Sequence, residues 1–438
     1  LDMYFGVLPY TTLHPWVCTH AFGLLMSLGR RLGDNVGVFC ITATFAVIEA
    51  FCYGKACQYM KRWPLGRMAD KIWIFFAFYP AFMVYAQSVV KDGPYIAFFT
   101  LFFTLLADTA LSSGKKAGAR RYASLFFLAL LICLFRRNGA FIALPALLFF
   151  ALWEKGRRRL IPIMGAFLVF ALFWGTGRVG DSLGIERASA RAILTIPFQQ
   201  TARIARDFPE DISKEEREAI EGVLPYKKLA SRYQEDLSDP IKNLYKEEAG
   251  AKEITAFLQT WAHLCLRHPL SSLEAFLAGS FGYLYPFYHF ETLDALDLAM
   301  SRHPSVDLGA FDISYFFGER IRFLFDGYVR LWEKVPVLSL SFHPAFYTWL
   351  LLFLAGYLLS RRRAKGILFL LPAAISVAVC LSSPVNGYLR YALPLAASSP
   401  ALCGFTYLYG AKEHGKKKEA GKERHGGEGK AKRSQMKP

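Results

Sequence analysis

The chain lacks the short motifs on which soluble metal and nucleotide enzymes depend. Its 8 cysteines include no CxxC pair and its 9 histidines no HExxH stretch, so zinc chemistry is not expected. It has no Walker loop, and no GxGxxG stretch opens a helix, which argues against nucleotide-driven chemistry. Helix-turn-helix and zinc-finger signatures are missing too, so the net charge of +17 does not indicate a nucleic-acid partner.

Acidic residues are scarce outside one block of the chain. Of 35 Asp and Glu residues, 24 lie between Gly177 and His343, together with 19 Lys and Arg. The remainder holds 33 basic and only 11 acidic residues, and many of the basic ones form short clusters between long apolar runs. With 54 % hydrophobic residues and a mean hydropathy of +0.25, this pattern is typical of a multi-pass protein of the cell membrane.

Nine apolar segments are long enough, or nearly so, to cross a bilayer as helices. We therefore predict an all-α polytopic membrane protein. The two segments on either side of Phe135 are short, which is typical of a tilted or broken pair. The nine segments are Asn35–Gly54, Ile72–Val90, Pro94–Leu111, Tyr122–Phe135, Gly139–Trp153, Leu160–Thr176, Pro344–Ser360, Gly366–Leu381 and Leu389–Gly410.

The basic clusters all fall on one side of such a nine-span arrangement, and we assign that side to the cytoplasm. The N-terminus then starts outside, and the chain opens at Leu1 without Met or a signal-peptide pattern, which predicts a missing first helix. The predicted regions are an extracytoplasmic segment (1–33), six spans (34–176), an extracytoplasmic domain (177–343), three spans (344–410) and a cytoplasmic tail (411–438).

Three of these regions have further local signals. Val17–Leu32 has an amphipathic helical pattern that would lie along the outer surface. The extracytoplasmic domain is predicted to be mainly helical, and Ser213 with Glu216 three residues later forms a capping box. The Lys-, Gly- and Glu-rich tail is predicted to be disordered and basic. It would either contact anionic lipid headgroups or keep the protein soluble.

Four cations lie at the outer ends of apolar segments, against the usual preference for the cytoplasmic side: Lys91, Arg136, Arg137 and Arg390. Arg can grip a phosphate as a bidentate fork, and Lys binds it as a point charge. Together they predict a site for an anionic ligand such as a lipid phosphate. The alternative for each residue alone is snorkelling to the interface or pairing with a carboxylate of the external domain.

Two carboxylates, Asp92 and Asp2, are candidates for acid–base chemistry. Asp92 begins an outer helix, where the helix dipole stabilises its charge, so it is either a helix cap or a functional carboxylate. Asp2 lies in the first external segment, where a general base could reach an acceptor hydroxyl. Glu49 and Asp108 are placed toward the cytoplasmic ends of their spans and are left out of the predicted site.

The chain resembles the GT-C superfamily of integral-membrane glycosyltransferases, and most closely an uncharacterised bacterial multi-pass family near it. The matching stretches follow one another over nearly the whole chain. They are His14-Pro15-Trp16, Lys91-Asp92-Gly93, Arg136-Arg137-Asn138-Gly139, Ile196–Gln200 with Arg203, Ser238-Asp239-Pro240 with Lys242, and Arg390-Tyr391 followed by Leu393-Pro394.

The resemblance implies a sugar donor linked to polyprenyl phosphate and used on the outer face. A glycan, lipid or protein of the cell envelope would be the acceptor, and the sugar would be inverted. Asp2 or Asp92 would be the acid–base residue, although Asp2 lies only 12 residues before His14, closer than the family pattern suggests. The outer cations would neutralise the leaving phosphate, and the matching stretches add His14, Asn138 and Tyr391 to the binding set.

Two other functions stay open at this stage. A transporter or flippase of a lipid-linked envelope precursor would favour an inverted repeat and charges near the bilayer midplane. A non-catalytic envelope-assembly protein would bind the lipid without turnover. The sequence names no certain cofactor and leaves a requirement for a divalent cation open.

Overall fold

The computed structural model describes residues 1–8, 10–11, 14–112, 118–186, 190–287, 311–313 and 319–434. Within these ranges the regular secondary structure is helical, and extended pairing is limited to the isolated bridges Thr11–Glu186 and Leu237–Val385. The predicted all-α class is therefore confirmed for the described part of the chain.

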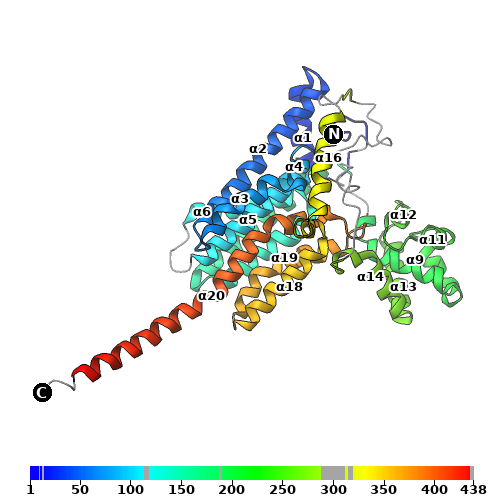
Figure 1. Cartoon of the computed structure of the whole chain (residues 1–438). Helices are drawn as coiled ribbons and strands as arrows, with labels where there is room; N and C mark the ends of the chain where they lie inside the picture. Colours follow the sequence, from blue (N-terminus) through cyan, green and yellow to red (C-terminus); the bar gives the residue numbers. More distant parts are fainter. Residues whose placement is uncertain are drawn as a thin grey trace.

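The first half of the chain forms a slanted bundle, drawn in blue to cyan in Figure 1. Its helices are α1 (Trp16–Arg30), α2 (Asp34–Lys61), α3 (Arg67–Phe78), α4 (Pro80–Ala86), α5 (Asp92–Leu111), α6 (Ala119–Phe135), α7 (Ala140–Trp153) and α8 (Leu160–Ser182). The short 3-10 turn η1 (Arg137–Gly139) joins α6 to α7.

A second group of helices lies beside this bundle, and a third returns to it (Figure 1). The lateral group comprises α9 (Thr195–Asp207), α10 (Lys214–Glu221), α11 (Tyr226–Arg232), α12 (Asp239–Lys242), α13 (Ala251–Arg267), α14 (Pro269–Ser280) and the turn η5 (Phe281–Tyr283). The returning group comprises α16 (Glu319–Lys334), α17 (Pro336–Ser339), α18 (Pro344–Ser360), α19 (Ile367–Leu381) and α20 (Leu389–Ser434).

Helix α5 is the centre of the bundle. It packs against α2, α6 and α20, and all of its residues from Asp92 to Ala110 are buried. Its sequence carries no charge between Asp92 and Asp108 and is rich in Phe and Leu on every face, which is typical of a helix enclosed by others. Its two ends therefore carry the only ionisable carboxyls of α5, and each end meets a different set of partners.

Among the described residues, four helices are long and apolar enough to cross a membrane: Asp34–Lys61, Asp92–Leu111, Gly156–Ser182 and Ala364–Leu381. A fifth candidate is the pair Pro336–Phe342 and Pro344–Ser360, bent by 94°. A helical membrane protein is consistent with this finding. The four or five candidate spans do not confirm the nine spans that the sequence predicted.

One predicted span is broken in the structure. The segment Ile72–Val90 was expected as a single helix, but it divides into α3 and α4 at Pro80. Tyr79, the residue before proline, takes an extended conformation with φ −69° and ψ 116°. Proline disfavours helical backbone at the preceding residue and removes a helix hydrogen bond, which explains the break.

The lateral domain has a hydrophobic core of its own, in which Phe198, Ile220, Leu229 and Phe257 are fully buried. The predicted capping box is confirmed. Glu216 N donates to Ser213 Oγ at 3.2 Å, and Ser213 N donates to Glu216 Oε2 at 2.9 Å.

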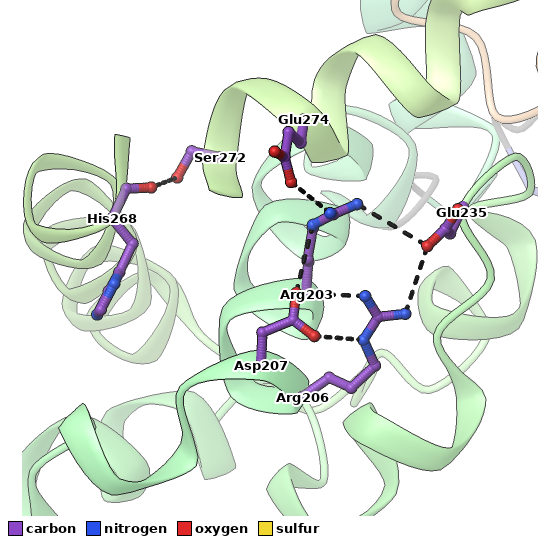
Figure 2. A network of polar contacts seen from close by, with 7 residues as sticks. All are labelled: Arg203, Arg206, Asp207, Glu235, His268, Ser272 and Glu274. Carbon is purple, nitrogen blue, oxygen red and sulfur yellow. Dashed lines mark hydrogen bonds and ion pairs between the residues drawn. The ribbon is translucent and has the colours of Figure 1, made fainter. Parts of the chain in front are cut away.

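An ion-pair network ties three segments of this domain together (Figure 2). Arg203 of α9 lies 3.4 Å from Asp207 and pairs with Glu274 of α14, while Arg206 lies 3.6 Å from Glu235. Gln200, one turn before, donates to Ser272 O at 2.9 Å. Arg203 and Gln200 therefore hold α9 against α14.

The tail departs from the prediction. Residues 411–434 were expected to be disordered, but α20 continues as a helix to Ser434 and projects away from the bundle in Figure 1. The segment is rich in Lys and Glu, which favour helix, although it also holds five Gly residues, which disfavour it. A segment appended to an existing helix also avoids the cost of nucleation, which explains the extension.

Candidate anionic-ligand site

The outer cations converge on one carboxylate. Asp92, the first residue of α5, has no solvent exposure and lies between two guanidinium groups. Arg390 donates to Asp92 Oδ2 through Nε at 2.8 Å and through Nη2 as well. Arg136 Nη1 lies 3.2 Å from Asp92 Oδ1. Residues far apart in the sequence therefore form one buried cluster, which we call the Asp92 cluster: Lys91, Asp92, Arg136 and Arg390.

Local structure explains how these residues meet. Lys91 and Asp92 begin α5, Arg136 follows the last residue of α6 in an extended conformation, and Arg390 is the second residue of α20. The Arg136 guanidinium also lies over the rings of Tyr95, at 5.3 Å, and Tyr391, at 5.5 Å. Such cation–π contacts orient the planar group.

The cluster carries more positive than negative charge. One carboxylate faces two guanidiniums, and Lys91 adds a third cation beside them. The side chain of Arg136 is only 12 % exposed and that of Arg390 31 %, so water stabilises this excess poorly. Each guanidinium has five N–H donors, more than Asp92 can accept. An anion reaching the exposed edge of Arg390 would complete the site.

Lys91 and His14 form a pair at the edge of the cluster. Lys91 Nζ lies 2.8 Å from His14 Nδ1. Burial, opposed by Asp92 and reinforced by Arg136, lowers the pKa of Lys91 to about 8. Partial burial and the nearby Lys91 charge lower the pKa of His14 to about 4, although the residue keeps contact with solvent. At neutral pH a charged ammonium therefore donates to a neutral imidazole.

Helix α1 anchors the segment that carries His14. Trp16 Nε1 donates to Thr176 O of α8 at 2.6 Å. Gly29 of α1 and Gly37 of α2 approach so closely that a Cβ on Gly29 would lie 2.6 Å from the Gly37 Cα. This tight packing fixes α1 across the start of α2, beside the Asp92 cluster.

The other predicted site residues have different positions. Tyr391 lies against Arg136, whereas Arg137 is exposed and forms no ion pair with any residue that the structure describes. Asn138 is half-buried in η1. Asp2 lies in an exposed turn, and no described contact brings its carboxylate to the Asp92 cluster.

Glu49 lies closer to the cluster than its place in the sequence suggested. It is 3 % exposed, near the middle of α2, and its Oε1 has no hydrogen-bond partner among the described residues. A Cβ on Gly93 would lie 2.3 Å from that oxygen, so Glu49 packs directly against the start of α5. The signal in the sequence was a lone carboxyl inside an apolar run.

Asp108 marks the opposite end of α5. It lies 16 residues beyond Asp92, which corresponds to about 24 Å along a helix. Its carboxylate accepts from Trp63 Nε1 at 2.9 Å and from Arg121 at 2.7 Å. Arg121 is the guanidinium that pairs with Asp108 among the described contacts, and Arg62 lines the same cavity as both of them, so two guanidiniums also lie near one carboxylate at this end of α5.

Two other kinds of chemistry, nucleophilic catalysis by a serine and metal binding, find little support among the described residues. The stretch Gly180–Gly184 has the letters of a GxSxG nucleophile motif, but it lies at the end of a helix and not after a strand, and Ser182 Oγ donates to Val179 O. Within the described ranges, no group of three His, Cys, Asp or Glu side chains is arranged to hold a metal ion.

Residues 9–423 match a protein family described as a family of unknown function, DUF6020. The chain belongs to this family. No curated protein and no solved structure matches it.

Proposed function

We propose that this DUF6020 protein is a membrane glycosyltransferase that takes a sugar from a polyprenyl-phosphate donor on the outer face of the membrane. The observation that carries the proposal is the buried pairing of Arg136 and Arg390 with the single carboxylate of Asp92. That arrangement leaves excess positive charge, which a bound phosphate would neutralise. Preorganised cations stabilise most strongly a group that gains negative charge as the reaction proceeds.

The nine-span arrangement is part of this proposal. In it, α3 with α4, α6, α7, α18 and the first part of α20 cross the membrane along with the four long apolar helices. The start of α5, the end of α6 and the start of α20 then share the outer face, and contacts within the Asp92 cluster agree with that placement. Residues 177–343 are extracytoplasmic and the C-terminus is cytoplasmic.

The proposed reaction uses the cations of this cluster. The acceptor hydroxyl oxygen forms a bond to the anomeric carbon while the bond from that carbon to the phosphate oxygen breaks, and the electron pair leaves with the polyprenyl phosphate. Lys91, Arg136 and Arg390 receive the negative charge, with Arg137, Asn138 and Tyr391 nearby. The hydroxyl proton passes to a general base.

In this proposal Asp92 is not the general base. Asp92 has no solvent exposure: Arg390 donates to its Oδ2, and Arg136 lies 3.2 Å from its Oδ1, which has no described hydrogen bond. An acceptor hydroxyl therefore does not reach this carboxylate. We therefore assign Asp92 to positioning the two arginines. Of the two carboxylates that the resemblance offers as base, this proposal keeps Asp2, which is exposed in a turn before His14 and would have to approach the Asp92 cluster when the donor binds.

One observation favours a transporter as the second candidate. The buried carboxyl of Glu49 lies near the middle of α2 without a described hydrogen bond to its Oε1. Intramembrane carboxyls of this kind are common in transport pathways. A flippase would move the intact donor across the bilayer and leave the sugar–phosphate bond unbroken.

Turnover separates the two functions. We expect protein in lipid nanodiscs, given polyprenyl-phosphate-linked radiolabelled hexoses and pentoses with envelope extract, to release polyprenyl phosphate and label an acceptor. A Lys91→Ala, Arg390→Ala double variant should lose about 100-fold or more in rate. A Lys155→Ala, Arg157→Ala variant removes the same charge from an exposed basic loop and should keep the wild-type rate.

Two outcomes would contradict the proposal. Equal turnover in the Lys91→Ala, Arg390→Ala variant and the wild type would show that these two cations take no part in the reaction. Intact donor crossing proteoliposome membranes, with no release of polyprenyl phosphate, would identify a flippase. Melting curves of all variants show whether a lost rate reflects lost fold.

A further inference from the structure

Helix α14 of the lateral domain turns apolar side chains outward. Leu270, Leu273 and Leu277 are spaced three and four residues apart, so they share one face of the helix, and Phe281 continues the stripe. Their exposed fractions are 74 %, 51 %, 39 % and 44 %. We call these four residues the α14 stripe. A contiguous exposed apolar surface of this kind marks an interaction site.

The opposite face of α14 is the one that the domain buries. Ser271, Ser272 and Ala275 are buried, and α14 packs there against α9. Gln200 of α9 donates to Ser272 O. Glu274 pairs with Arg203, as Figure 2 shows. Ser271, Ser272 and Ala275 therefore face the domain while the leucines face away from it, and Glu274, 61 % exposed, lies beside the stripe. This is the reverse of the pattern in a helix on the surface of a water-soluble domain.

Helix α14 lies beside the end of a candidate membrane span. Ala275, Phe276 and Gly279 line a small cavity together with Leu381, at the end of the candidate span Ala364–Leu381, and with Pro384. In Figure 1, α14 is the part of the lateral domain drawn nearest to α18 and α19. The stripe therefore lies at the level where an apolar span ends.

Aromatic residues at the same level support this placement. Phe281 stacks on Tyr285 at 4.9 Å between ring centroids, and Tyr285 contacts Phe287 at 5.6 Å. Trp349, 53 % exposed on α18, donates from Nε1 to Leu284 O at 2.7 Å. Tyr and Trp gather at membrane–water interfaces because their rings are apolar and their N–H and O–H groups reach water.

We propose that the α14 stripe inserts into the outer leaflet of the bilayer and holds the lateral domain against the membrane. The occupant is the lipid surface itself, because the stripe ends at Phe281, whose ring stacks on Tyr285, and the carbonyl of the neighbouring Leu284 accepts from the exposed Trp349 of the candidate span α18. The inference rests on the membrane arrangement in the proposed function. An amphipathic helix of this kind buries its apolar face about 5–10 Å deep, at the boundary between headgroups and acyl chains.

Depth-dependent quenching tests the proposal on the full chain in nanodiscs. A fluorescent noncanonical residue would replace Leu273, and lipids carrying a nitroxide near the headgroup would be the quencher. We expect several-fold stronger quenching there than at Lys228, an exposed position on α11. Phe353, 71 % exposed on the candidate span α18, serves as the membrane-embedded reference.

The outcomes separate this inference from the proposed function. Quenching at both 273 and 353, with little at 228, supports insertion of α14. Quenching at 353 alone overturns the inference and leaves the membrane arrangement intact. No quenching at 353 would contradict the arrangement itself and this inference with it. Protection of position 273 in a dimer, without lipid quenching, would instead assign the stripe to a second copy of the chain and overturn the inference.

Discussion

Replacing Asp92 by Ala should destabilise the protein by about 3–5 kcal/mol, because it leaves two largely buried guanidiniums without their counter-ion. Arg136 and Arg390 both depend on this carboxylate, and Asp92 itself has no contact with water. Unfolding of the detergent-solubilised protein, followed by circular dichroism against denaturant or temperature, measures the loss.

Asp70 provides the matched control for this prediction. It pairs with Lys61 at 3.3 Å, but the two side chains are 58 % and 71 % exposed. Asp70→Ala should cost less than about 1 kcal/mol, because water screens an exposed pair and the chain pays entropy to form it. Equal effects of the Asp70 and Asp92 variants would show that the Asp92 cluster has no special electrostatic role.

Replacing Gly93 by Ala should destabilise the bundle, because the start of α5 has little room for a methyl group. The added Cβ would lie 2.3 Å from Glu49 Oε1 and 3.0 Å from the backbone oxygen of Tyr85, so α2, α4 and α5 cannot all keep their places. Overpacking of this kind typically costs about 1–3 kcal/mol, and the backbone contact favours the upper end. Thermal unfolding and the yield of folded protein measure the effect.

A double-variant cycle tests the cause of that damage. Glu49→Ala removes the nearer obstacle, so it should recover part of the stability that Gly93→Ala loses. Gly54 of α2 is the control, since a Cβ there meets nothing within 4 Å and alanine favours helix over glycine by about 1 kcal/mol. If Gly93→Ala behaves like Gly54→Ala, Glu49 does not pack against α5 as described.

The sequence predicted which residues lie at the outer end of the bundle, but not how they pair. Lys91, Arg136 and Arg390 stood out because cations are rare at the outer ends of apolar segments. That Asp92 would neutralise two of them could not be predicted, because Asp92 and Arg390 are 298 residues apart and their pairing depends on how α5 packs on α20. An aspartate proposed as a base is therefore better explained as a positioning residue.

Glu49 shows a different limit of sequence reasoning. The apolar segment was bounded at Asn35–Gly54, which put Glu49 close to one end, whereas α2 extends to Lys61 and puts it near the middle. Helix ends are difficult to predict when the residues beyond the apolar run, such as Lys55 and Gln58, are themselves good helix formers. The break at Pro80 had a clear local signal, because proline interrupts helices, yet the apolar run around it favoured one span.

The most direct test of the central claim is the affinity of polyprenyl phosphate for the nanodisc-embedded protein as a function of pH. Above pH 7 a phosphate monoester is already fully charged, so changes there report on the protein. Lys91, with a pKa of about 8, is charged below that pH, and bound phosphate favours its charged form. Affinity should therefore stay constant up to pH 8 and then fall about tenfold per pH unit until the pKa of the complex is reached.

Variants assign that pH dependence to the cluster. Lys91→Gln should bind more weakly with no fall above pH 8, and Arg390→Gln should bind more weakly while keeping the fall. We expect polyprenyl phosphate and the protein to form a tight, Lys91-dependent complex at pH 7.5. Affinity that is unchanged by both substitutions, with the same pH profile as the wild type, would contradict it.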